Sequence, residues 1–177
     1  MAYTNITKRK LVQPVTYEEG YTHLRLDFGD DDGLVNRLIR TATNLAENYI
    51  EKDIAKTECT LTVEDFYSDT IRIDEGNFLS AISVYADGEE VLDNYVVRVY
   101  HNYFTVTFTT PIMANDLVVK FYTGFDEDEA PEDIKAAILI KLAELYDIDR
   151  SGYVMNNYKA TGAFETILNY HKPIRFR

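Results

Sequence analysis

The fold class is decided by residues 30–63, which read DDDGLVNRLIRTATNLAENYIEKDIAKTECTLTV. In the first part of this stretch, apolar residues recur at helical spacing and form two adjacent rows, one of Leu34, Leu38, Leu45 and Tyr49 and one of Val35, Ile39, Ala42, Ala46 and Ile50. Three acids, Asp30 to Asp32, precede the rows, where a helix dipole favours negative charge. After Thr57 the period changes to two. The stretch therefore predicts an amphipathic helix over 31–52, followed directly by strands.

Short strands are predicted from residue 57 to about residue 123. Polar and apolar residues alternate at 60–63 and again at 70–73, with a turn expected near Ser68-Asp69. Asp87-Gly88 is a strong two-residue hairpin signal and His101-Asn102 a weaker one. The strands that flank these two turns are expected at 81–86, 89–92, 95–100 and 103–108, and a last strand at 117–122. Such a run predicts an antiparallel sheet or a small sandwich.

Helices are predicted on both sides of this strand-rich region. Thr16 with Glu19 forms a capping box that starts a helix at 17–24. Pro131, followed by two acids, starts a strongly apolar helix over 131–148, and a short helix is expected at 163–169. The fold class is therefore α+β: a small helical bundle (helices near 17–24, 31–52, 131–148 and 163–169) with an antiparallel β insertion at about 57–123.

Charge is unevenly distributed along the 177 residues, whose formal net charge is −12. Residues 1–10 carry three basic side chains and no acid, residues 150–177 carry five basic side chains and one acid, and all other acids lie between these ends. Either the composition simply drifts at the termini, or the basic ends dock on a partner. The acidic total disfavours a protein that binds nucleic acid through a globally basic surface.

Composition also excludes some classes of protein. No stretch approaches the ~20 apolar residues of a membrane helix, and the N-terminus is polar and basic rather than signal-like. The single cysteine, Cys59, excludes an internal disulfide. We therefore expect neither a membrane protein nor a disulfide scaffold.

Motifs for catalysis or metal binding are absent from the sequence. There is no phosphate-binding glycine loop, no nucleophile elbow and no metalloprotease motif, and the three histidines show no metal-ligand spacing. The acids at 27–32 resemble a calcium loop, but Phe28 would occupy a ligand position and no bidentate Glu follows. We expect no enzyme, no cofactor and no metal site. Two alternatives remain open: a β-rich binding module with a platform of Tyr95, Tyr100 and Tyr103, and a metal-dependent hydrolase that uses the acid clusters.

Several segments, in order and spacing, resemble the head–tail connector proteins of tailed phages, which are also called adaptor or head-completion proteins. In the first half these are Val15-Thr16-Tyr17-Glu18-Glu19, His23-Leu24-Arg25-Leu26-Asp27, Asp30 to Asp32, and a helix with Leu38-Ile39, Ala42, Glu47 and Tyr49. In the second half they are Val119 to Phe125, Pro131, Ile134, Ala137-Ile138-Leu139, Tyr146, Phe164 to Leu168 and Tyr170 to Phe176. The resemblance covers about 15–56 and 117–176. The strand-rich middle and the basic start at Lys8 to Lys10 lie outside it.

The resemblance implies a structural virion protein at the head–tail interface, made in the host cytoplasm. Such subunits form a homo-oligomeric ring, of twelve copies matching the portal protein, and they contact a downstream stopper or tail protein. The genomic DNA passes through the ring without sequence-specific binding, and an acidic wall suits this passage because it repels phosphates. In this interpretation residues 1–14 are a basic N-terminal extension, 15–149 a connector domain that includes the insertion 57–123, and 150–177 a C-terminal docking tail.

Two groups of residues are the candidate contact sites. The apolar helix at 131–148 predicts a subunit interface formed by Ile138, Leu142, Leu145 and Tyr146. The tail predicts portal docking through apolar and basic anchors, namely Phe164, Ile167, Leu168, Tyr170, Lys172, Ile174, Arg175, Phe176 and Arg177. The alternative for the tail is that 164–168 packs back on its own bundle.

Overall fold

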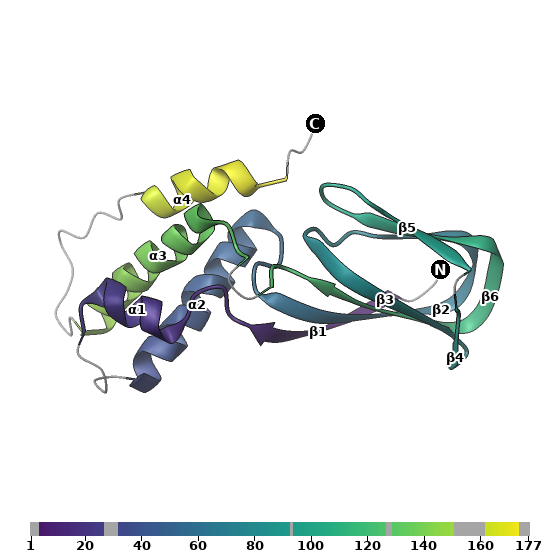
Figure 1. Ribbon diagram of the computed structural model, residues 1–177, viewed down its shortest axis with the longest axis horizontal. Helices are drawn as coiled ribbons and strands as arrows, with labels where there is room; N and C mark the ends of the chain where they lie inside the picture. Colours follow the sequence, from purple (N-terminus) through teal and green to yellow (C-terminus); the bar gives the residue numbers. More distant parts are fainter. Residues whose placement is uncertain (1–3, 27–31, 93, 127–128, 151–161, 174–177) are drawn as a thin grey trace. The chain divides into compact units, whose positions relative to one another are not determined.

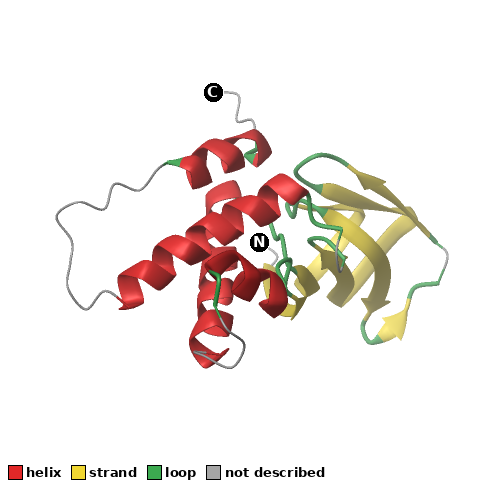
Figure 2. Ribbon diagram, turned by 60° about the vertical axis from the view of Figure 1, so that its left-hand side comes forward, coloured by secondary structure: helices red, strands yellow, loops and turns green. Residues whose placement is uncertain are grey.

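The computed structural model describes residues 4–26, 32–92, 94–126, 129–150 and 162–173 of the chain. The chain divides into two compact units. The β unit comprises residues 1–12 and 55–126, and the helical unit comprises residues 13–54 and 127–177. Figure 1 labels the elements of each unit, and Figure 2 distinguishes the helices in red from the strands in yellow.

The helical unit contains the helices that the sequence predicts. They are α1 (Tyr17–Leu24), α2 (Asp32–Ile50), α3 (Glu132–Arg150), α4 (Ala163–Leu168) and the 3-10 turn η1 (Asn169–His171). The range of α1 is the predicted one, α2 and α3 begin and end within two residues of their predicted limits, and the predicted short helix is α4 continued by η1. The predicted α+β fold class is thus confirmed for the helices.

Capping side chains determine where α1 begins. The Thr16 hydroxyl accepts a hydrogen bond from the Glu19 backbone N–H at 3.1 Å, and the Glu19 carboxylate accepts one from the Thr16 N–H at 2.7 Å. This is the predicted capping box, which satisfies two amides that the first helical turn leaves unpaired. The helix ends at Arg25, whose backbone is left-handed.

Asp32 links the start of α2 to α1. The Tyr21 hydroxyl, on a fully buried side chain, donates to Asp32 Oδ1 at 2.6 Å, and the Tyr17 hydroxyl donates to the same oxygen. Burial and the neighbouring Asp32 carboxylate both raise the pKa of Tyr21. The Asp32 charge also lies in the first turn of α2, as the sequence predicts, where the helix dipole favours it. The other acids of this run, at 27, 30 and 31, lie outside the described residues.

The three longer helices share one apolar core. Val35, Ile39, Ala42 and Ala46 of α2 and Ile134, Ala137, Ile138 and Leu142 of α3 are at most 2% exposed. At Gly20 of α1, an added Cβ would lie 2.9 Å from Ile39 Cδ1 and 3.2 Å from Leu142 Cδ2. The absence of a side chain at Gly20 therefore lets α1 lie close to Ile39 of α2 and to Leu142 of α3.

Among the residues that the structure describes, the β unit is one antiparallel sheet of six strands. They are β1 (Thr4–Val12), β2 (Lys56–Ile73), β3 (Phe78–Ala86), β4 (Glu89–Glu90), β5 (Tyr95–Val99) and β6 (Phe104–Thr123). The strand order is β1-β2-β6-β3-β4, and β5 pairs with β6 beside that path. Both predicted hairpins are present: Asp87 and Gly88 have the positive φ angles typical of an Asp-Gly turn, and Tyr100 N–H donates to the Tyr103 carbonyl at 2.9 Å.

Two details of the predicted strands are wrong. The turn expected near Ser68-Asp69 is an irregularity inside one long strand, β2, where the pairing with β6 shifts between Ser68 and Thr70. The strands predicted at 103–108 and 117–122 are likewise the two ends of a single strand, β6. Polar residues interrupt the alternation in both strands, and Pro111 adds to the interruption in β6. Because the residues of β6 between Thr107 and Ile112 have no partner on β2, they form a bulge, and each strand continues through it.

The first strand, β1, lies in the stretch predicted to be a basic extension, for which neither a helix nor a strand was expected. Here β1 pairs with β2 from Thr4 opposite Val63 to Val12 opposite Lys56. Ile6 points to the apolar side and packs against the core of the β unit. The pairing partner is far away in the chain, so the short run 4–12 gives only a weak local signal.

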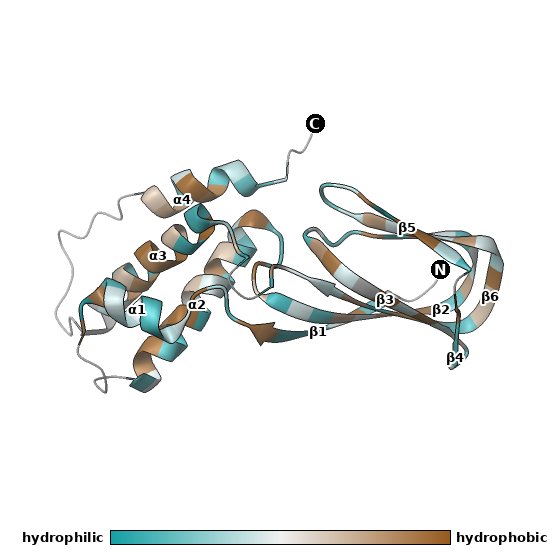
Figure 3. Cartoon of the chain, in the orientation of Figure 1, coloured by the Kyte–Doolittle hydropathy of each residue, from teal (hydrophilic) through white to brown (hydrophobic). Residues whose placement is uncertain are grey.

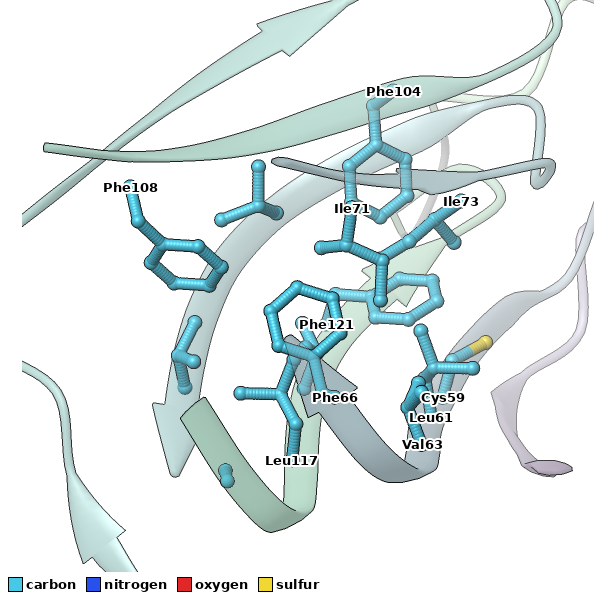
Figure 4. Close-up of a cluster of buried hydrophobic side chains, with 14 residues drawn as sticks. Cys59, Leu61, Val63, Phe66, Ile71, Ile73, Phe104, Phe108, Leu117 and Phe121 are labelled. Atoms are coloured by element: carbon cyan, nitrogen blue, oxygen red, sulfur yellow. The ribbon is translucent and has the colours of Figure 1, made fainter. Parts of the chain in front are cut away.

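The core of the β unit lies between the two halves of β2 and β6, which double over (Figures 1 and 4). Phe104 and Phe121 are both on β6, and in a straight strand they would lie about 55 Å apart. Their ring centroids are instead 4.9 Å apart in an edge-on contact. Cys59, Leu61 and Leu117 from one half face Ile71, Phe104 and Phe108 from the other. The doubled strands thus enclose a core of their own.

Candidate functional site

The C-terminal segment 163–173 packs on the helical unit. Phe164 is 4% exposed and Leu168 is fully buried. The Phe164 ring lies 6.0 Å from the Tyr49 ring of α2, and Lys141 Nζ of α3 lies 5.2 Å from the Phe164 ring centroid. Figure 3 shows brown apolar residues alternating with teal polar ones along α4. The segment is therefore anchored on α2 and α3 by its apolar side.

Polar contacts hold the end of this segment. The Tyr49 hydroxyl donates to Asn169 Oδ1 at 2.7 Å, and Lys172 Nζ lies 3.6 Å from the centroid of the Tyr49 ring. His171 Nε2 lies 2.7 Å from Asp133 Oδ2 in the first turn of α3. Tyr49 and Asp133 thus orient residues 169–172. No sequence motif indicates either contact, because the paired positions lie far apart in the chain.

His171 changes the acidity of Asp133. Partial burial acts to raise the pKa of the Asp133 carboxyl, but the hydrogen bond and charge of His171, with the backbone N–H of Ile134, lower it more. The pKa of Asp133 therefore lies below its ordinary value. A carboxyl with a depressed pKa stabilises the folded state above its unfolded pKa, and this contribution is lost as the pH falls through the folded pKa.

We expect the Asp133→Asn variant to destabilise the packing of residues 169–172, because it removes the ion pair with His171. The loss should be only about 0.5 kcal/mol, because the Asp133 side chain is half exposed to solvent. Amide NMR signals of 163–173 should shift in the variant at neutral pH. In the wild type the same signals should shift only as the pH falls below the ordinary range of an aspartate, because the pKa of Asp133 is depressed. Identical acid titrations of these amides in both proteins would contradict the role of the pair.

The predicted docking residues fall into three groups. Phe164 and Leu168 are buried in the subunit's own core, Ile167 is half-buried, and Tyr170 and Lys172 are exposed, Tyr170 by 83%. Ile174, Arg175, Phe176 and Arg177 lie outside the described residues. For 164–168 the structure thus shows the alternative packing on the bundle. Tyr170 is the first of the predicted docking residues that is exposed to solvent.

The predicted interface residues of α3 are placed mainly inside the subunit. Ile138 and Leu142 are fully buried, Tyr146 is 5% exposed, and Leu145 is half-buried. The first three belong to the core shared with α2 and α4, so the burial that their apolar character requires is supplied within one subunit. Of these four residues, only Leu145 keeps a substantial solvent-exposed surface.

The three tyrosines of the alternative binding platform do not form one surface. Tyr95 is half-buried, donates its hydroxyl to the Ile82 carbonyl at 2.9 Å and packs edge-on against Phe108. Tyr100 and Tyr103 stack with ring centroids 4.5 Å apart, and Arg72 lies 3.9 Å above the Tyr103 ring. Tyr95 therefore supports the core, and the stacked pair closes the β5–β6 turn.

The acid clusters gather no metal-ligand set within the part of the chain that the structure describes. No group of three or more His, Cys, Asp and Glu side chains there is arranged to hold a metal ion.

Among the described helices, none has both the length and the apolar character needed to cross a membrane.

Comparisons with known proteins give this geometry a context. A family model described as "Phage gp6-like head-tail connector protein" matches residues 16–154. No curated protein matches the chain significantly.

Similar solved structures come from particles of a gene transfer agent (GTA). One, titled "Neck of empty GTA particle computed with C6 symmetry", shares 14% identity with a TM-score of 0.76, over 98% of this chain and 97% of that chain. A second, titled "Virion of native gene transfer agent (GTA) particle", has a TM-score of 0.74 at 14% identity, over 97% of both chains. A third, titled "Neck of native GTA particle computed with C12 symmetry", has a TM-score of 0.67 at 12% identity, over 94% of this chain and 97% of that one.

At this low identity, the likeness to the solved structures shows a shared fold. The family model covers most of the chain, from the cap of α1 to beyond the end of α3, and it confirms the resemblance drawn from the sequence. This protein therefore belongs to the gp6-like head–tail connector family of phages.

Proposed function

We propose that this protein is a structural subunit of the ring that joins a phage head to its tail, and that it transforms no substrate. The family match over residues 16–154 carries this proposal. The titles of two similar solved structures describe necks computed with C6 and C12 symmetry, which supports a ring, here of twelve copies that match the portal protein. The subunit would be made in the host cytoplasm and would become part of the virion.

Docking on the portal is assigned to the C-terminal end. Residues 163–169 anchor the segment to α2 and α3, and Tyr170 and Lys172 are the first exposed residues beyond that anchor. The sequence that follows, 173–177, adds two arginines and two large apolar residues. In this arrangement 15–149 is the connector domain with its β insertion, and the docking tail of 150–177 contributes its last eight residues to the portal contact.

Two further contacts complete the proposal. On α3, Leu145 contributes to the interface with a neighbouring subunit, because it is the predicted interface residue that keeps exposed surface. The acidic body faces the DNA that passes through the ring, and its negative charge keeps phosphates from adhering to the wall. A stopper or tail protein binds the opposite side of the ring from the portal.

Native mass spectrometry of the subunit mixed with the portal protein of the same phage tests this function. We expect a complex that holds one copy of this chain for each portal subunit, and electron microscopy should show them as a ring with an open channel. A purified subunit that remains monomeric with the portal, or that turns over a small molecule, would contradict the proposal.

A further inference from the structure

Two large apolar side chains lie exposed beside the irregularity at which β2 and β6 double over (Figure 1). Tyr67 of β2 is 74% exposed, and Met113 of β6 is 77% exposed. The two residues are neighbours, because the register of the sheet sets Tyr67 directly opposite Met113. Single exposed apolar residues are ordinary on protein surfaces, whereas adjacent ones are more typical of a contact surface.

An inversion of the strand pattern turns both side chains outward. From residue 57 to residue 63 of β2 the odd-numbered residues are buried, and continuation of this alternation would also bury residue 67. Asp65 has a left-handed backbone with a φ of 52°, and directly beyond it the alternation is inverted, so that Tyr67 is exposed. On β6 the buried residues have even numbers up to Ala114 and odd numbers from 117 onward, which leaves Met113 exposed. The two strands thus present their large apolar residues to solvent at the same level.

Acidic side chains adjoin this apolar pair. Glu64, Asp65 and Asp116 are exposed, and the register sets Glu64 directly opposite Asp116. Such a like-charged pairing gives the sheet no stability of its own. Neither 61–71 nor 109–119 contains a lysine or an arginine. We call the bend patch this apolar and negatively charged group of residues, which consists of Glu64, Asp65, Tyr67, Met113 and Asp116.

We propose that the bend patch is the surface on which the protein on the tail side of the ring docks, through a segment that is basic and apolar. In this contact, lysine or arginine side chains of that segment pair with Glu64 and Asp116, and an apolar side chain covers Tyr67 and Met113. The inference rests on the proposed function, because it needs a ring between the portal and the tail. It identifies the part of the subunit that the stopper or tail protein contacts.

Charge argues against the other neighbours of a ring subunit as the occupant. The C-terminal end proposed to dock on the portal is basic, so its site on the portal is acidic by complementarity and repels the bend patch. The phosphates of DNA are repelled in the same way. A second copy of this chain has a net charge of −12, and Lys8 of its strand β1 is already paired with Glu75 at 2.7 Å. A basic segment of the tail-side protein is the complement that remains.

Exposed acids beside apolar residues have another use, which the test must separate from docking. They keep a surface soluble and keep sheets from pairing with one another, and the bend patch would then need no partner. Reversal of the charges separates the two uses. Solubility depends on charge of either sign, whereas docking on a basic segment depends on negative charge.

The test complements a phage that lacks the gene for this chain with full-length variants and counts tailed particles by electron microscopy. Tyr67→Ser/Met113→Ser removes the apolar pair, and Glu64→Lys/Asp116→Lys reverses two of the acids. Each double variant should lower the fraction of heads that carry a tail by about tenfold or more. Mass spectrometry of the same heads should find this chain in its normal amount, because the ring itself still forms on the portal.

Matched controls lie on β5, which pairs with the opposite half of β6. Val99→Ser removes an apolar side chain that is 54% exposed, and Arg98→Glu reverses an exposed charge. Both should leave tail joining unchanged. Circular dichroism should show a normal melting temperature for every variant, because all the substituted side chains are exposed.

Photo-cross-linking identifies the occupant directly. With p-benzoylphenylalanine in place of Met113, irradiated virions should yield a cross-link to a tail-side protein, within a peptide that contains lysine or arginine. The same group in place of Val99 should give no such cross-link.

The possible outcomes separate the inference from the proposed function. Normal tail joining by either double variant would overturn docking on the bend patch, and so would a cross-link from position 113 to the portal, to the capsid or to a second copy. Loss of the ring from the heads of these variants would also overturn it, because the patch would then be part of the ring's own contacts. Wild-type heads without a ring of this chain would overturn the proposed function, and the docking with it.

Discussion

Truncation after His171 is expected to abolish portal binding while the subunit stays folded. The truncation removes Lys172 and the basic and apolar residues that follow it, but it keeps the anchors Phe164, Leu168 and Asn169 and the contact of His171 with Asp133. Since a few residues carry most of the energy of an interface, we expect affinity for the portal to fall by about 100-fold or more. Biolayer interferometry with immobilised portal protein measures this loss.

Two further variants make the truncation interpretable. Tyr170→Ala removes a side chain that is 83% exposed in the subunit, and it should weaken portal binding without lowering the melting temperature. Leu168→Ala, by contrast, removes a fully buried side chain and should destabilise the helical unit by about 2–5 kcal/mol. Full portal affinity in the truncated subunit would refute the docking role of the C-terminal end.

Phe104→Ala is expected to destabilise the β unit by about 3–5 kcal/mol. The Phe104 side chain is fully buried and touches both Phe78, at 4.6 Å between ring centroids, and Phe121, at 4.9 Å. It therefore joins the two halves of the doubled strands, and its removal leaves a cavity between them. Urea denaturation followed by circular dichroism measures the change in the free energy of unfolding.

The control for this substitution lies close by. Val99→Ala shortens a side chain that is 54% exposed on the neighbouring strand β5, and it should change the free energy of unfolding by less than about 0.5 kcal/mol. Phe104→Leu, which keeps most of the apolar volume, should fall between the two. A loss below about 1 kcal/mol for Phe104→Ala would show that the halves of β2 and β6 do not depend on each other.

The parts of the fold that follow from local chemistry were predictable from the sequence. The capping box of Thr16 and Glu19 and the Asp87-Gly88 turn depend on residues a few positions apart, and both are present where their patterns place them. The continuity of β2 through Ser68 and the strand β1 depend on partners on distant strands. A sequence pattern cannot distinguish a bulge from a turn, because both interrupt the alternation in the same way.

In the candidate site, too, some features are visible in the sequence and others depend on distant partners. The apolar and basic character of the C-terminal end is visible in the sequence, but the separation of anchors from exposed residues is not. Phe164 and Leu168 are buried only because α2 and α3 present a surface to them. Tyr49 reaches Asn169 across 120 residues of sequence.

The distant pairing of β1 has a consequence for how this protein is made. Lys8 meets Glu75 67 residues later, and Cys59 of β2 meets Thr123 of β6 64 residues later. A nascent chain therefore leaves the ribosome with its first strand, and then its longest ones, awaiting partners that do not yet exist. Folding dominated by such remote contacts is slow, on the order of milliseconds to seconds. The sheet of the β unit is therefore completed only after β6 has been synthesised.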